Sequence, residues 1–208
     1  MNLRFIGDVL DHWKGSIIGR LSEANLLHRL NVDQMATDFS QWGEVDHSLY
    51  ADLLRIDRSM IIHHAQDLWS NRKQYLEEML AVQGDMFLDP DIGICTNSQP
   101  GSEHLKALEL HALLDRGPTR VVMVYQHIRA RKTRERVLDI MDFLQQKGPG
   151  FHAYSYESAS AAMLFFSRRS ERLNPIGEFY QRLLDWHAKE RICHWQSPST
   201  TLRLVGRR

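Results

Sequence analysis

The chain has 208 residues, of which 43% are hydrophobic and 25% are charged, and these are the proportions of an ordinary globular protein. Its 26 basic residues balance 26 acidic residues, which excludes a protein that attracts nucleic acid through its overall charge; any such attraction has to be local. No stretch approaches the roughly 18 consecutive apolar residues that span a bilayer, so no membrane partner is expected.

The first half of the chain carries one clear helix signal. Apolar residues recur at helical spacing from Asp8 to Leu21, and Asp8 is placed to cap the start of that helix. Residues 1–7 are expected to be extended. The weaker signals of this half predict a strand at 30–39, helices at 46–57 and 67–82, and a short strand at 60–64.

The second half alternates strand and helix signals more clearly. Met86–Leu88 is a short apolar run, and Val121–Tyr125 is a continuous apolar run that is typical of a strand covered on both faces. The other predicted elements of this half are helices at 102–116, 133–147 and 175–190 and strands at 151–156 and 161–167.

This order of elements predicts an α/β fold. Alternating strands and helices are typical of a doubly wound, Rossmann-like sheet that is mostly parallel. The last two strands lie too close in sequence for a helical crossover, so we expect an antiparallel strand at the C-terminal end of the sheet. The length favours a single domain over residues 1–208. The two cysteines, Cys95 and Cys193, favour reduced thiols in a cytoplasmic protein.

Polar side chains follow two strands that we expect to be neighbours. One apolar strand ends in Asp89-Pro90-Asp91, and the next is followed by His127. Open parallel sheets bind ligands outside the carboxyl ends of their strands, so Asp89, Asp91 and His127 are the candidate catalytic residues. Two carboxylates that flank a proline suit Mg²⁺ or Mn²⁺, which makes both aspartates candidate metal ligands. The same residues also favour a plain turn, and that alternative stays open.

The densest basic segment of the chain comes just after His127. It contains Arg129, Arg131 and Lys132, followed by two further arginines around a single acid. Basic residues between a strand end and a helix suit phosphate groups. Together with Tyr125 they are the candidate phosphate-binding residues, and nucleic acid or a nucleotide is the expected partner. A solvated helix face is the alternative interpretation.

The N-terminal helix predicts a second polar cluster. Asp8, Asp11 and His12 share the face opposite its apolar residues, and Lys14 lies close by in sequence. Aspartate and histidine one helical turn apart can bind a metal or each other, and simple solvent exposure is the alternative. Gly15 inside this helix costs about 1 kcal/mol relative to alanine, which indicates the close approach of a backbone or a ligand.

One carboxylate falls among apolar residues. Glu109 lies within the apolar arc of the helix predicted at 102–116, and we expect a structural ion pair there, for example with an arginine. No phosphate-binding P-loop, dinucleotide-binding glycine motif, serine-hydrolase elbow or zinc-protease motif is present in the sequence.

Two segments resemble a known family. The helix Asp8–Ile18 and the later Phe87–Pro90 are similar to a branch of methyltransferase-fold proteins that includes three-cysteine-motif partner proteins and a bacterial ribosomal RNA adenine methyltransferase. The resemblance covers about half of the chain. It implies that Asp89-Pro90 ends the fourth strand of that fold and that S-adenosylmethionine is the cofactor. Two departures stand beside it: residues 32–38 lack the glycines of the family's cofactor loop, and Asp91-Ile92 replaces a proline and an aromatic residue.

Three hypotheses about function follow. The first is a metal-dependent phosphoester hydrolase, nuclease-like in substrate, in which Asp89 and Asp91 hold Mg²⁺ or Mn²⁺ and His127 acts as acid or base. The second is an active or degenerate methyltransferase relative that binds S-adenosylmethionine or a nucleotide in the same crevice. The third is a non-catalytic binding or assembly module on an enzyme-like fold.

Overall fold

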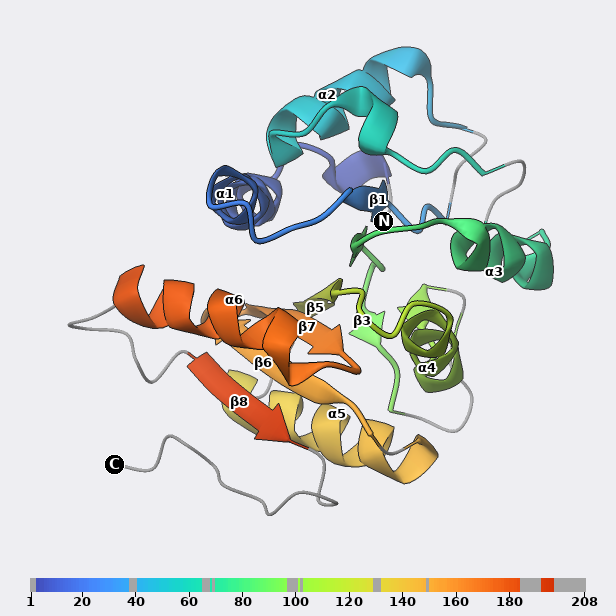
Figure 1. The fold of residues 1–208 in the computed structure, drawn as a ribbon. Coiled ribbons are helices and arrows are strands. Elements are labelled where there is room, and N and C mark those ends of the chain that lie inside the picture. The colour runs from blue at the N-terminus through green and yellow to red at the C-terminus, as the bar shows by residue number, and fades with distance from the viewer. Residues whose placement is uncertain are drawn as a thin grey trace.

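The computed structural model describes residues 3–37, 41–64, 68, 70–96, 101, 103–128, 132–148, 150–183 and 192–196 (Figure 1). Its strands are β1 (Asn31–Asp33), β2 (Met86–Leu88), β3 (Gly93–Ile94), β4 (His104–Leu105), β5 (Val122–His127), β6 (His152–Glu157), β7 (Ala161–Ser167) and β8 (Ile192–Gln196). Six of these strands form one sheet in the order β1-β2-β5-β7-β6-β8, and β3 pairs with β4 in a separate small sheet.

The main sheet is mixed, with four of its six strands running in the same direction. β1, β2 and β5 pair in parallel. β7 runs antiparallel to both of its neighbours, β5 and β6, and β8 runs antiparallel to β6. The carboxyl ends of β1, β2 and β5 therefore lie at one edge of the sheet, and their amino ends lie at the other.

Helices cover both faces of this sheet. They are α1 (Val9–Glu23), α2 (Glu44–Leu54), α3 (Arg72–Ala81), α4 (Ala107–Arg116), α5 (Thr133–Lys147) and α6 (Ser170–Leu183), with short 3₁₀ turns at Leu3–Phe5 and Arg58–Met60. Figure 1 shows α1 and α2 packed together on one side and α4 and α5 on the other. No helix of the described residues has the length and apolar character needed to cross a membrane.

Side chains of the strands pack into two hydrophobic cores, one on each face of the sheet. Phe87 and Met123 pack with α1, α2 and α6, whereas Leu88 and Val124 pack with α3, α4 and α5. Both faces are buried, as the apolar runs without polar alternation predicted. The architecture is a Rossmann-like α/β fold, built from a doubly wound sheet with reversed strands at its C-terminal side.

Close packing of α1 on α2 explains a glycine inside a helix. A Cβ atom added at Gly15 would overlap the carbonyl oxygen of Leu53 in α2. The two helices therefore meet backbone to backbone at this point, which is the close approach that the sequence predicted. This contact holds α1 against α2, the helix that carries Tyr50, and the Tyr50 hydroxyl binds Asp89 at the candidate site.

Several predicted elements differ from the structure. Residues 3–5 form a 3₁₀ turn and are not extended. The strand expected at 60–64 reduces to a single bridge between Val32 and Ile61. Helix α4 begins at Ala107 and not at residue 102, because His104–Leu105 pairs with β3. Helix α6 begins at Ser170, five residues before the expected start, and Pro175 lies inside it.

The buried carboxylate on α4 is paired as expected. Glu109 forms a two-point ion pair with Arg72 of α3, with distances of 2.6 Å from Nε to Oε1 and 2.8 Å from Nη2 to Oε2. Glu109 also accepts a hydrogen bond from the backbone N–H of Lys106 at 2.9 Å, which caps α4. The prediction of a structural ion pair is confirmed.

Candidate functional site

A small pocket lies at the carboxyl edge of the sheet, where β2 and β5 end. Its volume is about 140 Å³. We call it the carboxyl-edge pocket, and it is lined by Phe5, Asp8, Asp11, Lys14, Asp89, Pro90, Asp91, Tyr125 and His127. The two polar clusters that the sequence predicted separately, one on the N-terminal helix and one after the strands, thus form a single site.

Lys14 joins these two clusters. Its Nζ lies 2.9 Å from Oδ1 of Asp11 and 2.8 Å from Oδ2 of Asp89, and all three side chains are buried. The ammonium group also lies 4.2 Å from the centre of the Tyr125 ring, within cation–π distance. Burial alone would lower the pKa of Lys14, but the two carboxylates outweigh burial and raise it. Lys14 is therefore a fixed positive charge at the base of the pocket.

Tyr50 of α2 supplies a second donor to the same carboxylate. Its hydroxyl group donates to Oδ2 of Asp89 at 2.7 Å, and its side chain is fully buried. Burial and the nearby Asp89 raise the pKa of Tyr50 well above its usual value, so the hydroxyl stays protonated. Asp89 is thus oriented by one ammonium group and one phenol. No local pattern points to Tyr50, because 39 residues separate it from Asp89.

The first turn of α1 holds the other two aspartates. Asp8 caps the helix and accepts from the backbone N–H of Leu10 at 2.8 Å, while Oδ2 of Asp11 accepts from Gly7 at 2.8 Å. Burial raises the pKa of Asp11, although Lys14 opposes this shift. His12 is exposed and is not part of the pocket lining. The expected cluster therefore loses His12, because the buried face of α1 passes through positions 11, 14, 15 and 18.

The loop after β2 is held on one side by Thr37, in the loop after β1, and on the other side by Gln126 of β5. Oδ2 of Asp91 accepts from the Thr37 hydroxyl at 3.0 Å. Gln126 of β5 accepts from the backbone N–H of Ile94 at 2.8 Å. Gly93, at φ +104°, packs against the Gln126 amide and leaves no room for a Cβ atom. These contacts fix the shape of a segment that the sequence alone could also describe as a plain turn. A glutamine within the otherwise apolar run of β5 is the sequence feature that points to Gln126.

Tyr125 and His127 complete the pocket on the β5 side. The Tyr125 hydroxyl lies 3.5 Å from Nδ1 of His127. Burial raises the pKa of Tyr125, against the opposing effect of Lys14, so the hydroxyl is a neutral hydrogen-bonding group. His127 is half-buried and lines the pocket. Its predicted role as an acid or base stays a prediction.

The basic segment after β5 is only partly described. Arg129 and Arg131 lie outside the described residues. Lys132 is exposed, lies 3.7 Å from a carboxylate oxygen of Glu135, and is not part of the pocket lining. Arg134 donates to Glu157 at 2.9 Å and so stabilises the join between α5 and β6. The phosphate-binding role of this segment stays a prediction.

The carboxyl end of β1 is closed by a buried network. Asp33 is 0% exposed, accepts from the Tyr75 hydroxyl, and lies 2.9 Å from Nε2 of His64. The other ring nitrogen of His64 lies 2.8 Å from Glu78, and the ring stacks on Tyr75 with centroids 3.6 Å apart. Burial alone would lower the pKa of His64, but Asp33 and Glu78 outweigh it and raise the pKa. His64 thus shares its two ring nitrogens between two carboxylates.

A divalent metal ion does not fit the described residues well. Oδ2 of Asp89 already accepts from Lys14 and Tyr50, and Oδ2 of Asp91 accepts from Thr37. The fixed ammonium of Lys14 stands where a cation would approach Asp89, and like charges at this distance repel strongly. Within the described ranges, no group of three histidine, cysteine or acidic side chains is arranged to hold a metal ion.

S-adenosylmethionine does not fit the described end of β1 either. The resemblance implies a glycine-rich loop there, with backbone exposed to the cofactor. Instead, Met35 occupies the left-handed position at φ 45°, and Asp33 is covered by Tyr75 and His64. The carboxyl-edge pocket, at about 140 Å³, is also well below the roughly 300 Å³ at which small-molecule pockets begin. It has room for one polar group and not for a whole cofactor.

Comparisons with known proteins are sparse. No protein-family model matches the chain, and no curated protein matches it. The chain is similar to a crystal structure of protein LPL1258 from Legionella pneumophila str. Philadelphia 1, of family DUF519, with 8% sequence identity and a TM-score of 0.41. That similarity covers 76% of this chain and 59% of the other, so the chain spans about three-fifths of the length of that protein. A similarity this distant carries no argument about function.

Proposed function

We propose that this chain is a degenerate methyltransferase-fold protein that binds an amino-bearing group in the carboxyl-edge pocket. The group would be the end of a larger molecule, such as the exocyclic amine of a nucleobase in a nucleotide or nucleic acid. The observation that carries the proposal is the lining of the pocket: among its described residues, four aspartates stand against one lysine.

The charge of the pocket favours a hydrogen-bond donor as ligand. An ionised carboxylate accepts hydrogen bonds and donates none, and an amino group offers N–H donors to it. Carboxylates recognise the amine of cytosine in this way in protein–DNA complexes. A phosphate group would instead be repelled by the same four carboxylates. The acidic lining therefore supports an amine more strongly than a phosphate.

The orientation of Asp89 supports the same conclusion. Lys14 and Tyr50 both bind its Oδ2, which fixes the carboxylate plane at the end of β2. The resemblance implies an Asp-Pro pair at this strand end, and Asp89-Pro90 lines the pocket. Lys14 holds Asp89 in place, so this chain's own residues supply acceptors in a fixed position without a metal ion.

Metal-dependent phosphoester hydrolysis is the second candidate. It keeps Asp89 and Asp91 as metal ligands and His127 as acid or base, and the pocket does contain all three. The ammonium of Lys14, at 2.8 Å from Asp89, argues against a second cation beside it. We therefore rank this hypothesis below amine binding. We expect either activity to take place in the cytoplasm.

Matched nucleosides test the proposal. Adenosine and cytidine carry an exocyclic amine that inosine and uridine lack, so thermal shift and calorimetry should detect the first pair and not the second. A ligand at 100 times its dissociation constant adds about 2.7 kcal/mol to the free energy of unfolding. Asp91→Asn should weaken adenosine binding about tenfold or more, because hydrogen bonds to a charged group contribute about 1.5–3 kcal/mol. Asp52→Asn, an exposed aspartate of α2 outside the pocket, is the matched control.

Other ligands decide between the hypotheses. S-adenosylmethionine and Mn²⁺ belong in the same thermal shift series. Stabilisation by S-adenosylmethionine would show that the chain is not degenerate. Stabilisation by Mn²⁺ that is lost in Asp91→Asn but kept in Asp52→Asn would favour the hydrolase. Equal responses to adenosine and inosine would contradict amine recognition.

A further inference from the structure

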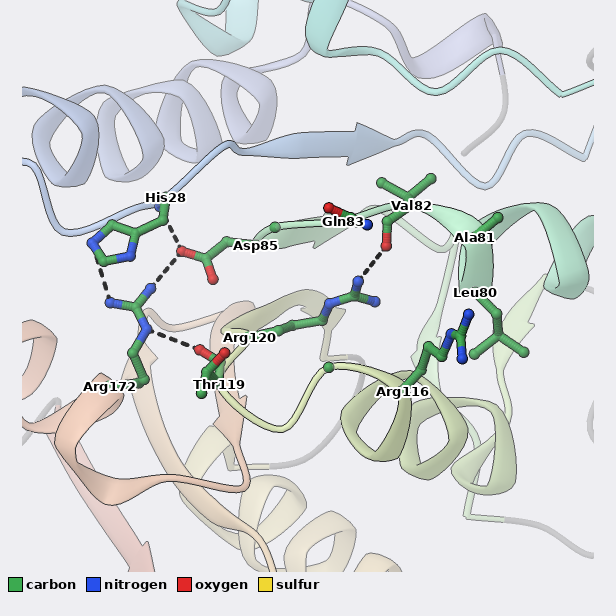
Figure 2. Close-up of a pocket in the computed structure, with 12 residues that line it drawn as sticks. His28, Leu80, Ala81, Val82, Gln83, Asp85, Arg116, Thr119, Arg120 and Arg172 are labelled. Carbon is green, nitrogen blue, oxygen red and sulfur yellow. Dashed lines mark hydrogen bonds and ion pairs between the residues drawn. The ribbon is translucent and has the colours of Figure 1, made fainter.

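A second pocket lies at the opposite, amino edge of the same sheet (Figure 2). Its volume of about 390 Å³ lies within the range of small-molecule pockets. Asp85 directly precedes β2, and Arg120 lies two residues before β5, so the pocket sits where these strands begin. We call it the amino-edge pocket. Its charged lining consists of Asp85, Arg116, Arg120 and Arg172, with His28 beside them.

The single carboxylate among the described lining residues is already engaged. Oδ1 of Asp85 accepts from the backbone N–H of Val121 at 2.7 Å. Oδ2 accepts from the backbone N–H of His28 at 2.7 Å and from Nη2 of Arg172 at 2.8 Å. Asp85 is 1% exposed. Its direct ion pair is therefore with Arg172, as Figure 2 shows.

Arg120 is buried without a comparable partner. It is 5% exposed, and its guanidinium group donates to the carbonyl oxygen of Val82 and to the sulfur of Met86. Its Nε is buried and has no hydrogen-bond partner among the described residues. A guanidinium group has five N–H donors, and neither of its acceptors here is charged. Asp85 interacts with Arg120 electrostatically but forms no ion pair with it, so this buried cation is only partly compensated and is prepared for an anion.

Arg116 adds a third guanidinium group at the rim. It lies in the last turn of α4, is exposed, and forms no ion pair with any residue that the structure describes. In Figure 2 its side chain lies beside Leu80, on the same side of the pocket as Arg120. Three guanidinium groups against one carboxylate leave two positive charges in the lining. A phosphate monoester carries about two negative charges at neutral pH.

We propose that the amino-edge pocket binds a small phosphate-bearing molecule, with its phosphate group held by Arg116 and Arg120. Guanidinium groups bind phosphate oxygens in pairs of parallel hydrogen bonds, which suits a planar donor better than an ammonium group. Arg172 lies at the opposite end of the pocket from Arg116 (Figure 2), where Asp85 and the carbonyl oxygen of Thr119, at 2.9 Å from its Nε, hold it in place. The site is separate from the carboxyl-edge pocket and does not depend on its function.

The rest of the lining suits the organic part of such a molecule. Leu80 and Val82 form an apolar wall, and Gln83 and Thr119 add uncharged polar groups. Nη1 of Arg172 lies 3.4 Å from Nε2 of His28. Since arginine only donates, Nε2 of His28 is the acceptor in this contact. The lining thus has one apolar side and one cationic side.

The test is calorimetry and thermal shift with inorganic phosphate and phenyl phosphate, against sodium chloride at the same ionic strength. Both phosphates should bind and stabilise the full chain, and chloride should not. Arg116→Gln removes an exposed group and leaves the fold intact, and it should weaken phosphate binding about tenfold or more. Arg20→Gln, an exposed arginine of α1 outside the pocket, should bind phosphate like the unaltered chain.

Arg120→Met is the stronger variant and should abolish phosphate binding. If it does not fold, Arg116→Gln against Arg20→Gln still decides the matter. Equal responses to phosphate and chloride would overturn the proposal, because the pocket would then act only through general charge screening. Unchanged phosphate binding in Arg116→Gln would overturn it as well.

Discussion

Strand β2 has a buried aspartate at each end, and the surroundings of the two residues are opposite in charge. Asp85 precedes the strand and Asp89 follows it, and each is 1% exposed. Arginines outnumber carboxylates in the lining around Asp85, whereas carboxylates outnumber lysine around Asp89. A chain with no net charge therefore has an arginine-rich pocket and an aspartate-rich pocket at the two edges of one sheet. The overall charge of the chain therefore does not indicate the local charge of either pocket.

The largest expected effect comes from removing the cation at the carboxyl edge. Lys14→Met leaves both Asp11 and Asp89 buried without their shared ammonium group, and Tyr50 alone cannot neutralise a charge. Breaking a buried ion pair in this way typically costs about 3–5 kcal/mol. Urea denaturation should show that loss in the free energy of unfolding. Lys73→Met, at an exposed position of α3, is the control and should change little. A loss below about 1 kcal/mol in Lys14→Met would mean that these two aspartates take up protons when the lysine is removed.

The corresponding substitution at the amino edge should destabilise the protein less. Arg172→Met takes the ion pair from Asp85, but this carboxylate keeps hydrogen bonds from the backbone N–H groups of Val121 and His28. We expect a loss of about 1–3 kcal/mol in the free energy of unfolding, the usual cost of an unsatisfied polar group. Arg169→Met, an exposed neighbour, is the control. If Arg172→Met were as damaging as Lys14→Met, the two ends of β2 would be equally dependent on a side-chain cation.

Removal of a single hydrogen bond should cause the next smaller loss of stability. Tyr50→Phe keeps the buried ring but removes the 2.7 Å bond to Asp89. Lys14 remains in place, so the expected loss is about 1–2 kcal/mol, measured by urea denaturation. The Tyr50→Phe and Lys14→Met changes should be non-additive in the double variant, because both residues bind the same oxygen. Strict additivity would show that the two donors act on Asp89 independently.

The smallest expected effect is a dependence on pH at the end of β1. The pKa of His64 is raised in the folded chain by Asp33 and Glu78, against the effect of burial. A group with a raised folded pKa stabilises fully below its unfolded value, about 6.5 for histidine, and this stabilisation is lost as the pH rises through the folded value. The free energy of unfolding should therefore fall above neutral pH. In His64→Gln this part of the pH profile should flatten, and an unchanged slope would assign it to other groups.

Local patterns in the sequence predicted the second half of the fold well. The bounds of α5 at 133–147 and of β7 at 161–167 match the prediction, because glycine and proline follow α5 and β7 is a continuous apolar run between polar residues. The parallel pairing of β2 with β5, which brings Asp89 near His127, also followed from the element order. The predicted start of α4 was wrong, because β3 and β4 are two-residue strands, too short to show a pattern in the sequence.

The candidate site was predicted in its parts but not as a whole. One pocket is lined by seven of the residues that the sequence predicted as candidates. The sequence patterns, however, indicated two separate clusters, one on α1 and one at the strand ends. Their union depends on Lys14 meeting Asp89 across 75 residues, which no local period can indicate. The amino-edge pocket had no sequence signal, because its arginines lie on separate elements.

The missing side chain at position 15 sets a limit on how this protein can vary. Since a methyl group there would collide with the main chain of α2, even alanine, the best helix former, is excluded at this position. Any larger residue would move α1 outward and withdraw the neighbouring lysine from the strand end. The helix thus gives up some of its intrinsic stability so that a single hydrogen atom separates its backbone from that of α2.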